Sequence, residues 1–240
     1  MAYDYIGLVN DVNRRLNEVE LTSSNFATAG GEYGMIKDAV NSSIRFINQH
    51  EYEWPFNHVE ETETLTAGIL RYSFPADAKT IDFDTFRIKR NDTLGNETRL
   101  LKVLSYEDYL SKYVDYEYNT SSSLRGLPDY VFRSPSREFG LIKIPDQAYE
   151  LVYEYYRLPV DLLNATDVPS VPEQFRYIIV DGAMHYAYLF RGETQEAQVA
   201  QAKYLDEIKS MRSLYVNRYD YIRSTAIQQN TASVSSFRVF

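Results

Sequence analysis

The side chains best suited to bind a metal gather between residues 50 and 63. His50 and His58 fall in this stretch, together with five glutamates: Glu51, Glu53, Glu60, Glu61 and Glu63. Imidazole and carboxylate groups are common ligands of zinc and related ions. However, the spacing matches no recognised ligand motif, and Trp54-Pro55 changes the chain direction between the two histidines. We therefore expect these side chains to be solvated and predict no metal site.

The candidates for acid–base or nucleophilic chemistry are equally weak. Asp82 and Asp84 share one face of a predicted strand, as paired glycosidase carboxylates can, but solvent-facing pairs have the same spacing. His185 lies in an apolar helix stripe, which favours a core-edge or interface histidine over a catalytic base. There is no cysteine, no Gly-x-Ser-x-Gly, and the glycine-rich segment 30–34 lacks the flanking strand and Lys-Ser/Thr of a phosphate loop. We predict neither enzymatic activity nor a cofactor.

Charge and composition restrict the partners of this 240-residue chain. Its formal net charge is -9, which argues against a general duplex-binding surface, although DNA could still slide past it. Basic residues do collect towards the end of the last predicted helix, which is more typical of an exposed helix face than of a partner-facing stripe: Lys203, Lys209, Arg212, Arg218 and Arg223. The 22 tyrosines favour protein–protein contact as much as a tyrosine-rich monomer. No secretory signal or membrane span is predicted.

Helices are predicted at both ends of the chain. Segments 3–19 and 32–49 have apolar residues at helical spacing, with Phe26 as an anchor between them. A second pair begins at the capping-box pattern Ser170-Val171-Pro172-Glu173, breaks at Arg191-Gly192 and continues to Ile222, so its last helix has about 30 residues. The predicted inner face of the first helix of this pair consists of Phe175, Ile178, Ile179, Ala183, Tyr186, Leu189 and Phe190. We expect the four stripes to pack together as one bundle.

Between the helix pairs the apolar period changes to that of strands. Segments 62–66 and 69–74 predict a hairpin around Ala67-Gly68, and further strands are predicted at 81–89, 99–104, 129–133, 140–144 and 150–157. A short helix at 105–113 and a loop at 115–126 interrupt them. The predicted strands follow one another closely in the sequence, with no helices between them that could serve as crossover connections. This spacing predicts an antiparallel domain.

The predicted fold class is α+β, with a helical bundle formed by N- and C-terminal segments, an inserted antiparallel β domain and an extended C-terminal arm. Its predicted parts are residues 1–57, 58–165, 166–223 and 224–240. The arm is polar until its apolar end at Val234, Phe237, Val239 and Phe240. Exposed apolar groups suit capture by a neighbouring molecule. On the long helix, the candidate subunit-interface residues are Tyr204, Met211, Tyr215 and Tyr219.

The order of these features resembles the head-to-tail adaptor proteins of tailed bacteriophages, in particular the tail tubular protein A type. The similarity covers nearly the whole chain but contains no single chemical motif. The matching pieces are Val40-Asn41 with Ile44, Trp54-Pro55-Phe56, Pro128-Asp129-Tyr130, Leu141-Ile142-Lys143-Ile144-Pro145, Leu151-Val152-Tyr153-Glu154-Tyr155-Tyr156, Val171-Pro172-Glu173-Gln174-Phe175, Gly182-Ala183, and Ala197, Tyr204 and Met211 of the last helix.

This resemblance implies a structural virion protein of the neck or tail, assembled in the host cytoplasm. It implies a homo-oligomeric ring, usually a dodecamer, between the portal protein and the next tail component, a nozzle or tail tube protein. Genomic DNA would pass through the ring without sequence-specific binding, and the C-terminal arm would dock on the portal. The alternative from another class is a β-rich carbohydrate- or receptor-binding module of a virion, favoured by aromatic residues in the middle domain.

Overall fold

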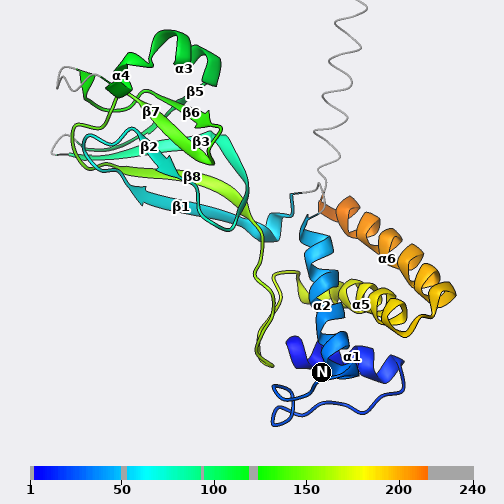
Figure 1. Cartoon of the computed structure of the whole chain (residues 1–240). Helices are drawn as coiled ribbons and strands as arrows, with labels where there is room; N and C mark the ends of the chain where they lie inside the picture. Colours follow the sequence, from blue (N-terminus) through cyan, green and yellow to red (C-terminus); the bar gives the residue numbers. More distant parts are fainter. Residues whose placement is uncertain (1–2, 50–52, 93–94, 119–123, 216–240) are drawn as a thin grey trace, which may run out of the picture. The chain divides into compact units, whose positions relative to one another are not determined.

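The computed structural model describes residues 3–49, 53–92, 95–118 and 124–215. It divides into a helical unit, Met1–Ile47 with Leu162–Phe240, and a β unit, Asn48–Asp161 (Figure 1). The predicted α+β class, with helices from both ends of the chain and an inserted β domain, is confirmed. The predicted arm, including Val234, Phe237, Val239 and Phe240, lies outside the described residues.

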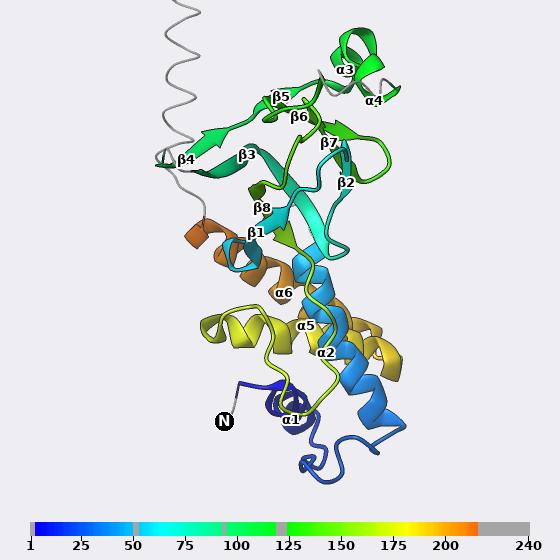
Figure 2. The same ribbon diagram turned by 90° about the vertical axis from the view of Figure 1, so that its left-hand side faces the viewer.

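In the described part of the helical unit there are four α-helices: α1 (Tyr5–Arg15), α2 (Glu32–Gln49), α5 (Arg176–Arg191) and α6 (Thr194–Tyr215) (Figure 2). Asp4 caps α1 by accepting a hydrogen bond from the Gly7 N–H at 2.9 Å, which satisfies one of the free amides of the first turn. Helix α2 has the predicted bounds. The part of the predicted last helix beyond Tyr215 lies outside the described residues.

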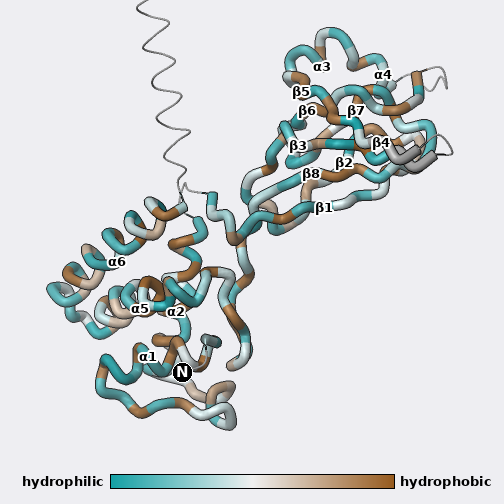
Figure 3. Tube along the Cα trace, turned by 180° about the vertical axis from the view of Figure 1, so that it is seen from behind, coloured by the Kyte–Doolittle hydropathy of each residue, from teal (hydrophilic) through white to brown (hydrophobic). Residues whose placement is uncertain are grey.

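The apolar stripes of the four helices supply buried residues of the helical unit. Brown segments along each helix in Figure 3 mark these apolar positions. The buried residues include Leu8, Val12, Ile36, Val40, Ile47, Ile179, Ala183, Ala197, Ile208 and Met211. Phe26 is also buried, with its ring 5.1 Å from that of Tyr5, as its predicted anchoring role requires. The predicted helix 3–19 ends earlier than expected, because α1 stops at Arg15 and Asn17 takes a left-handed conformation. Val19, at the end of the predicted segment, is therefore 74% exposed.

The start of α5 differs from the predicted capping box. Pro172 has an extended conformation, a 3₁₀ turn at Glu173–Phe175 follows, and neither the turn nor α5 has a side-chain cap. The Ser170 hydroxyl is buried without a hydrogen-bond partner among the described residues. The other end agrees with the prediction, since Gly192 ends α5 at φ 79°, a conformation that glycine adopts without steric cost.

Asn41 joins the two halves of the helical unit. Its buried amide nitrogen donates to Leu162 O at 3.0 Å and to the Tyr5 hydroxyl at 3.1 Å, and its amide oxygen accepts from Leu162 N at 3.0 Å. Nearby, Tyr5 N donates to Asp167 O at 2.8 Å. The chain returning from the β unit is therefore hydrogen-bonded to both N-terminal helices.

A close approach of three helices occurs at Gly182 of α5. The hydroxyl of Tyr204 on α6 donates to Ser43 O on α2 at 2.8 Å and accepts from Ser43 Oγ at 3.3 Å. A Cβ atom at Gly182 would lie 2.2 Å from Ser43 Oγ and 2.6 Å from ring carbons of Tyr204. The absence of a side chain at Gly182 is therefore what permits these contacts. Burial raises the pKa of the Tyr204 hydroxyl, so it remains a neutral donor.

The β unit contains two four-stranded sheets. The first has the order β1-β8-β3-β4, from strands His58–Thr64, Glu150–Arg157, Ala78–Asp92 and Gly95–Leu100. The second has the order β2-β7-β6-β5, from Arg71–Ser73, Glu138–Ile142, Tyr130–Ser134 and Lys102–Leu104. The named strands pair in antiparallel fashion, as predicted, except that β5 pairs with β6 in parallel.

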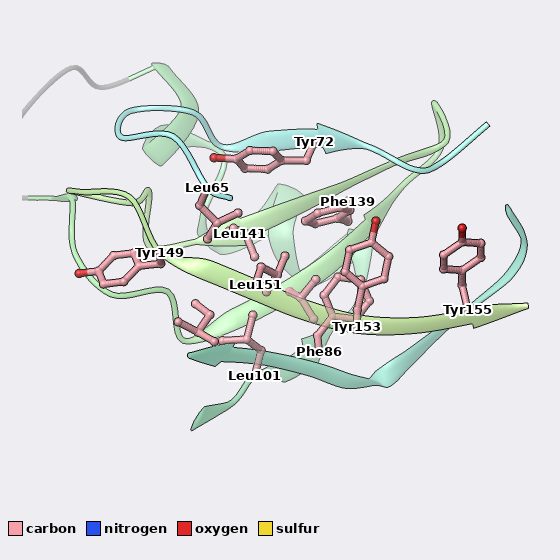
Figure 4. Close-up of a cluster of buried hydrophobic side chains, with 12 residues drawn as sticks. Leu65, Tyr72, Phe86, Leu101, Phe139, Leu141, Tyr149, Leu151, Tyr153 and Tyr155 are labelled. Carbon is pink, nitrogen blue, oxygen red and sulfur yellow. The ribbon is translucent and has the colours of Figure 1, made fainter. Parts of the chain in front are cut away.

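The core of the β unit lies between the two sheets (Figure 4). It is rich in aromatic rings, among which Phe86 and Tyr153 stack with centroids 4.7 Å apart. A second cluster, around Tyr109 and Phe132, lies beneath helix α3 (Tyr106–Lys112), which begins at the predicted cap Ser105. Arg71 donates to both carboxylate oxygens of Glu117, at 2.9 and 2.8 Å, and so attaches helix α4 (Asp115–Tyr118) to β2.

Three predictions for the β unit were wrong in detail. Residues 62–74 form no hairpin: Gly68 does turn the chain, but β1 and β2 belong to different sheets, and the buried Leu65 lies between them. The predicted strand 99–104 is divided between β4 and β5, which also lie in different sheets. The predicted loop 115–126 begins as α4. A 3₁₀ turn at Pro55–Asn57 precedes β1.

Candidate docking site

The predicted chemistry-bearing residues lie apart from one another. His58 contacts Glu154 at 2.9 Å on the outer face of the first sheet, where Arg87 also reaches Glu154 at 3.1 Å. Asp82 and Asp84 are exposed within an irregular stretch of β3. The Nδ1 of His185 lies 2.8 Å from Ala197 O, so the ring joins α5 to α6. Among the described residues no group of three or more such side chains could hold a metal ion.

The aromatic residues that favoured a carbohydrate-binding module are mostly internal. In the described part of the β unit most of them belong to or pack against the two cores. Trp54, Phe56 and Tyr156 lie outside these clusters but are at least partly buried, and Tyr118 alone among the described aromatic residues of the unit is strongly exposed. None of the helices in the described ranges is long and apolar enough to span a membrane.

A charged cluster connects α1, α5 and α6. The carboxylate of Asp181, only 4% exposed, pairs with Arg15 and lies 2.9 Å from Lys203 Nζ. Burial opposes its ionisation, but Lys203 and Arg15 outweigh that effect and lower the pKa of Asp181. Burial, and then the negative charge of Asp181, raise the pKa of the neighbouring Glu207 to about 7. Glu207 is therefore mostly protonated below about pH 7, and above that pH its negative charge is disfavoured by burial and by Asp181.

We expect Glu207→Gln to stabilise the protein at about pH 8 by roughly 1 kcal/mol and to change little at about pH 5. The folded-state pKa of Glu207 exceeds its ordinary value of 4.5. The contribution of protonated Glu207 to the free energy of unfolding is therefore fully present below pH 4.5 and is lost as the pH rises through about 7. Thermal unfolding at both pH values measures this, with Glu196→Gln, at an exposed site on α6, as the control. A loss of stability at pH 8 would contradict the prediction.

The helical unit has an apolar groove where α1 ends, α2 begins and α5 ends. Its volume is about 280 Å³, and its apolar walls are Leu16, Met35, Ile36, Ala187 and Phe190. Met35 and Phe190 are each 50% exposed. Phe190 and Leu189 were predicted to face the core, but in the last turn of α5 they extend beyond the helices that cover the rest of the stripe. We call this surface the helix-end groove.

Ion pairs hold one rim of the helix-end groove. Arg191 Nε donates to Glu32 Oε1 at 2.7 Å, and its terminal nitrogen lies 2.8 Å from Glu18. These contacts fix the last residue of α5 against the start of α2 and against the loop after α1. A small apolar depression with a charged rim can receive an apolar side chain from another molecule, as the centres of protein interfaces do.

The predicted interface residues lie in different places. Tyr204 and Met211 are buried in the core of the helical unit, so these side chains present little surface to a second subunit. Tyr215 is partly exposed, with its ring 5.8 Å from that of Phe175. Tyr219 lies outside the described residues. An interface role for Tyr215 and Tyr219 stays a prediction. The place of Met35 in the groove was not predicted, because the sequence around it does not indicate that this apolar side chain is exposed.

The exposed apolar groove of the helical unit is a surface of the kind that contacts other macromolecules. The family model described as SU10 adaptor protein matches residues 3–230, and the chain belongs to this family. It is therefore a bacteriophage structural adaptor protein, and the resemblance found in the sequence is confirmed. The family implies contact with portal and tail components and a place in the neck or tail of the virion. No curated protein matches the chain.

Proposed function

We propose that this protein forms a ring that bridges the portal to the tail and lines the channel for the genome. The observation that carries the proposal is the family match, which spans both units and extends past the last described helix. Twelve copies would match the symmetry of a dodecameric portal. The C-terminal arm, with Phe237 and Phe240, would dock on a portal subunit.

Charge supports the proposed passage of DNA. A channel wall that neutralised many phosphates would hold the genome, because released counterions drive such binding. The net charge of -9 instead favours a wall that DNA passes without adhering. The β unit would contact the next tail component.

Purified portal rings provide the direct test. The full chain, mixed with portal, is expected to sediment with it and to form a ring whose symmetry electron microscopy can read. Absence of co-sedimentation at every protein concentration would contradict the bridging role. A chain that binds portal without forming a closed ring would contradict the channel role.

The helix-end groove would contribute to contact between adjacent subunits. Phe190→Asp is expected to weaken assembly about 30-fold, because a charge placed at the centre of a buried apolar contact costs roughly 2 kcal/mol or more. Analytical ultracentrifugation of the ring or of the portal complex measures this effect.

The matched control for Phe190→Asp is Leu163→Asp. Leu163 is also exposed in the helical unit but is not among the residues that line the groove. Equal assembly of both variants with the original protein would exclude the groove from the interface. Because Phe190 is half exposed in the single chain, thermal unfolding should change little, which separates assembly from folding.

A further inference from the structure

The β unit contains a second concave site, different in chemistry from the helix-end groove. It has a volume of about 550 Å³ and lies beside the start of β3, the β6–β7 turn and the residue after β8. One part of its lining is apolar, from Phe74, Ile81 and Leu158. The other part carries three cations, Lys79, Arg133 and Arg137. We call it the cationic pocket.

The pocket is unusual in a chain with nine more acidic than basic residues. None of the described residues that line it is acidic. Arg133 is exposed, and its side chain makes no ion pair or hydrogen bond with the described residues. Arg137 donates to Ala78 O at 3.2 Å, which is an uncharged acceptor. Lys79 Nζ donates to Asn48 O at 2.9 Å and also interacts with the negative charge of Glu53. The positive charge of the pocket therefore comes mainly from Arg133 and Arg137.

Arg137 occupies a backbone position that does not favour arginine. It ends the three-residue connection between β6 and β7 with φ 58°, in the left-handed region. Glycine or asparagine is the usual residue at such a position, and another side chain costs of the order of 1 kcal/mol. Among the described residues the Arg137 side chain makes one hydrogen bond, from a single guanidinium nitrogen to Ala78 O at 3.2 Å. A role for the guanidinium in binding would account for arginine here.

We propose that the cationic pocket binds a carboxylate of a partner protein, presented next to an apolar side chain. The cations would pair with the carboxylate, and the apolar wall of Phe74, Ile81 and Leu158 would cover the neighbouring side chain. The volume suits a few side chains and not a whole domain. This interaction needs neither portal nor ring formation, so it stands or falls separately from the proposed function.

An acidic protein segment fits the pocket better than nucleic acid does. Binding to a DNA backbone uses rows of cations that follow successive phosphates along an open surface. Here three cations converge on one hollow with an apolar wall, and the chain as a whole would repel a polyanion. A single carboxylate is repelled less by the negative chain than a polyanion is, and the apolar side chain beside it can contact the apolar wall of the pocket.

Calorimetric titration of the full chain with a blocked peptide tests the proposal. The probe has aspartate between two phenylalanines, and its counterpart has asparagine in place of aspartate. The aspartate peptide is expected to bind at least about tenfold more tightly, and Arg133→Gln should remove most of that difference. Lys102→Gln is the matched control, because it deletes an exposed cation of the same unit outside the pocket.

Arg137→Gly separates binding from folding. It should weaken the aspartate peptide about tenfold while the unfolding midpoint stays equal or rises, because glycine relieves the left-handed backbone. Equal affinity for the two peptides, or no effect of Arg133→Gln, would overturn the proposal. Tight competition by a short DNA duplex would also overturn it and assign the pocket to nucleic acid.

Discussion

Gly182→Ala is expected to lower the free energy of unfolding by about 2–3 kcal/mol. The added methyl group would lie 2.2 Å from Ser43 Oγ and 2.6 Å from the ring of Tyr204. Tyr204 cannot simply move away, because its hydroxyl is hydrogen-bonded to Ser43 O at 2.8 Å inside the core. Alanine is the better helix former, but that gain of about 1 kcal/mol is smaller than the cost of the clash. Urea unfolding of the purified variant measures the difference.

Gly34→Ala is the matched control and should have the opposite sign. Gly34 also lies within a helix of the same unit, yet a Cβ atom there would meet nothing within 4 Å. Helix propensity alone then applies, and the variant should gain about 0.5–1 kcal/mol. If both variants lost stability equally, close packing at Gly182 would not be the reason for its glycine.

Asn41→Leu is expected to cost about 3 kcal/mol or more and to loosen the chain that returns from the β unit. Leucine has similar volume but leaves the N–H and C=O of Leu162 without partners in a buried place. Thermal unfolding measures the loss, and amide exchange at Leu162 locates it. Asn164→Ala is the control, because among the described residues its exposed side-chain amide contacts only Asp167, at 3.3 and 3.4 Å. A variant as stable as the control would show that Asn41 does not join the two halves.

Periodicity predicted the single elements well. Helix α2 and strand β8 have the predicted bounds, because each is long, regular and ended by clear signals. Pairing was harder to predict. The turn at Gly68 has the local chemistry of a hairpin, yet the chain passes there from one sheet to the other, with Leu65 buried at the crossing. Only the tertiary arrangement of two sheets decides which strand β1 accepts as its neighbour.

The candidate sites were less predictable than the fold. An apolar stripe shows that a helix face is buried but not which molecule covers it, so Tyr204 and Met211 were assigned to an interface although the helical unit itself covers them. The helix-end groove arises where three helices end near one another, and no stretch of sequence contains all of its walls. The cationic pocket combines β3 with the β6–β7 turn in the same way.

The insertion of one unit within the other also sets an order of events during synthesis. The β unit is formed by one continuous segment, residues 48–161. In the helical unit, by contrast, Tyr204 contacts Ser43, which is 161 positions earlier in the chain. The ribosome releases the second half of the bundle last, so the β unit can be complete while α1 and α2 still lack their partners. During that interval the apolar faces of these two helices are open to water, and long-range closure of this kind is slow.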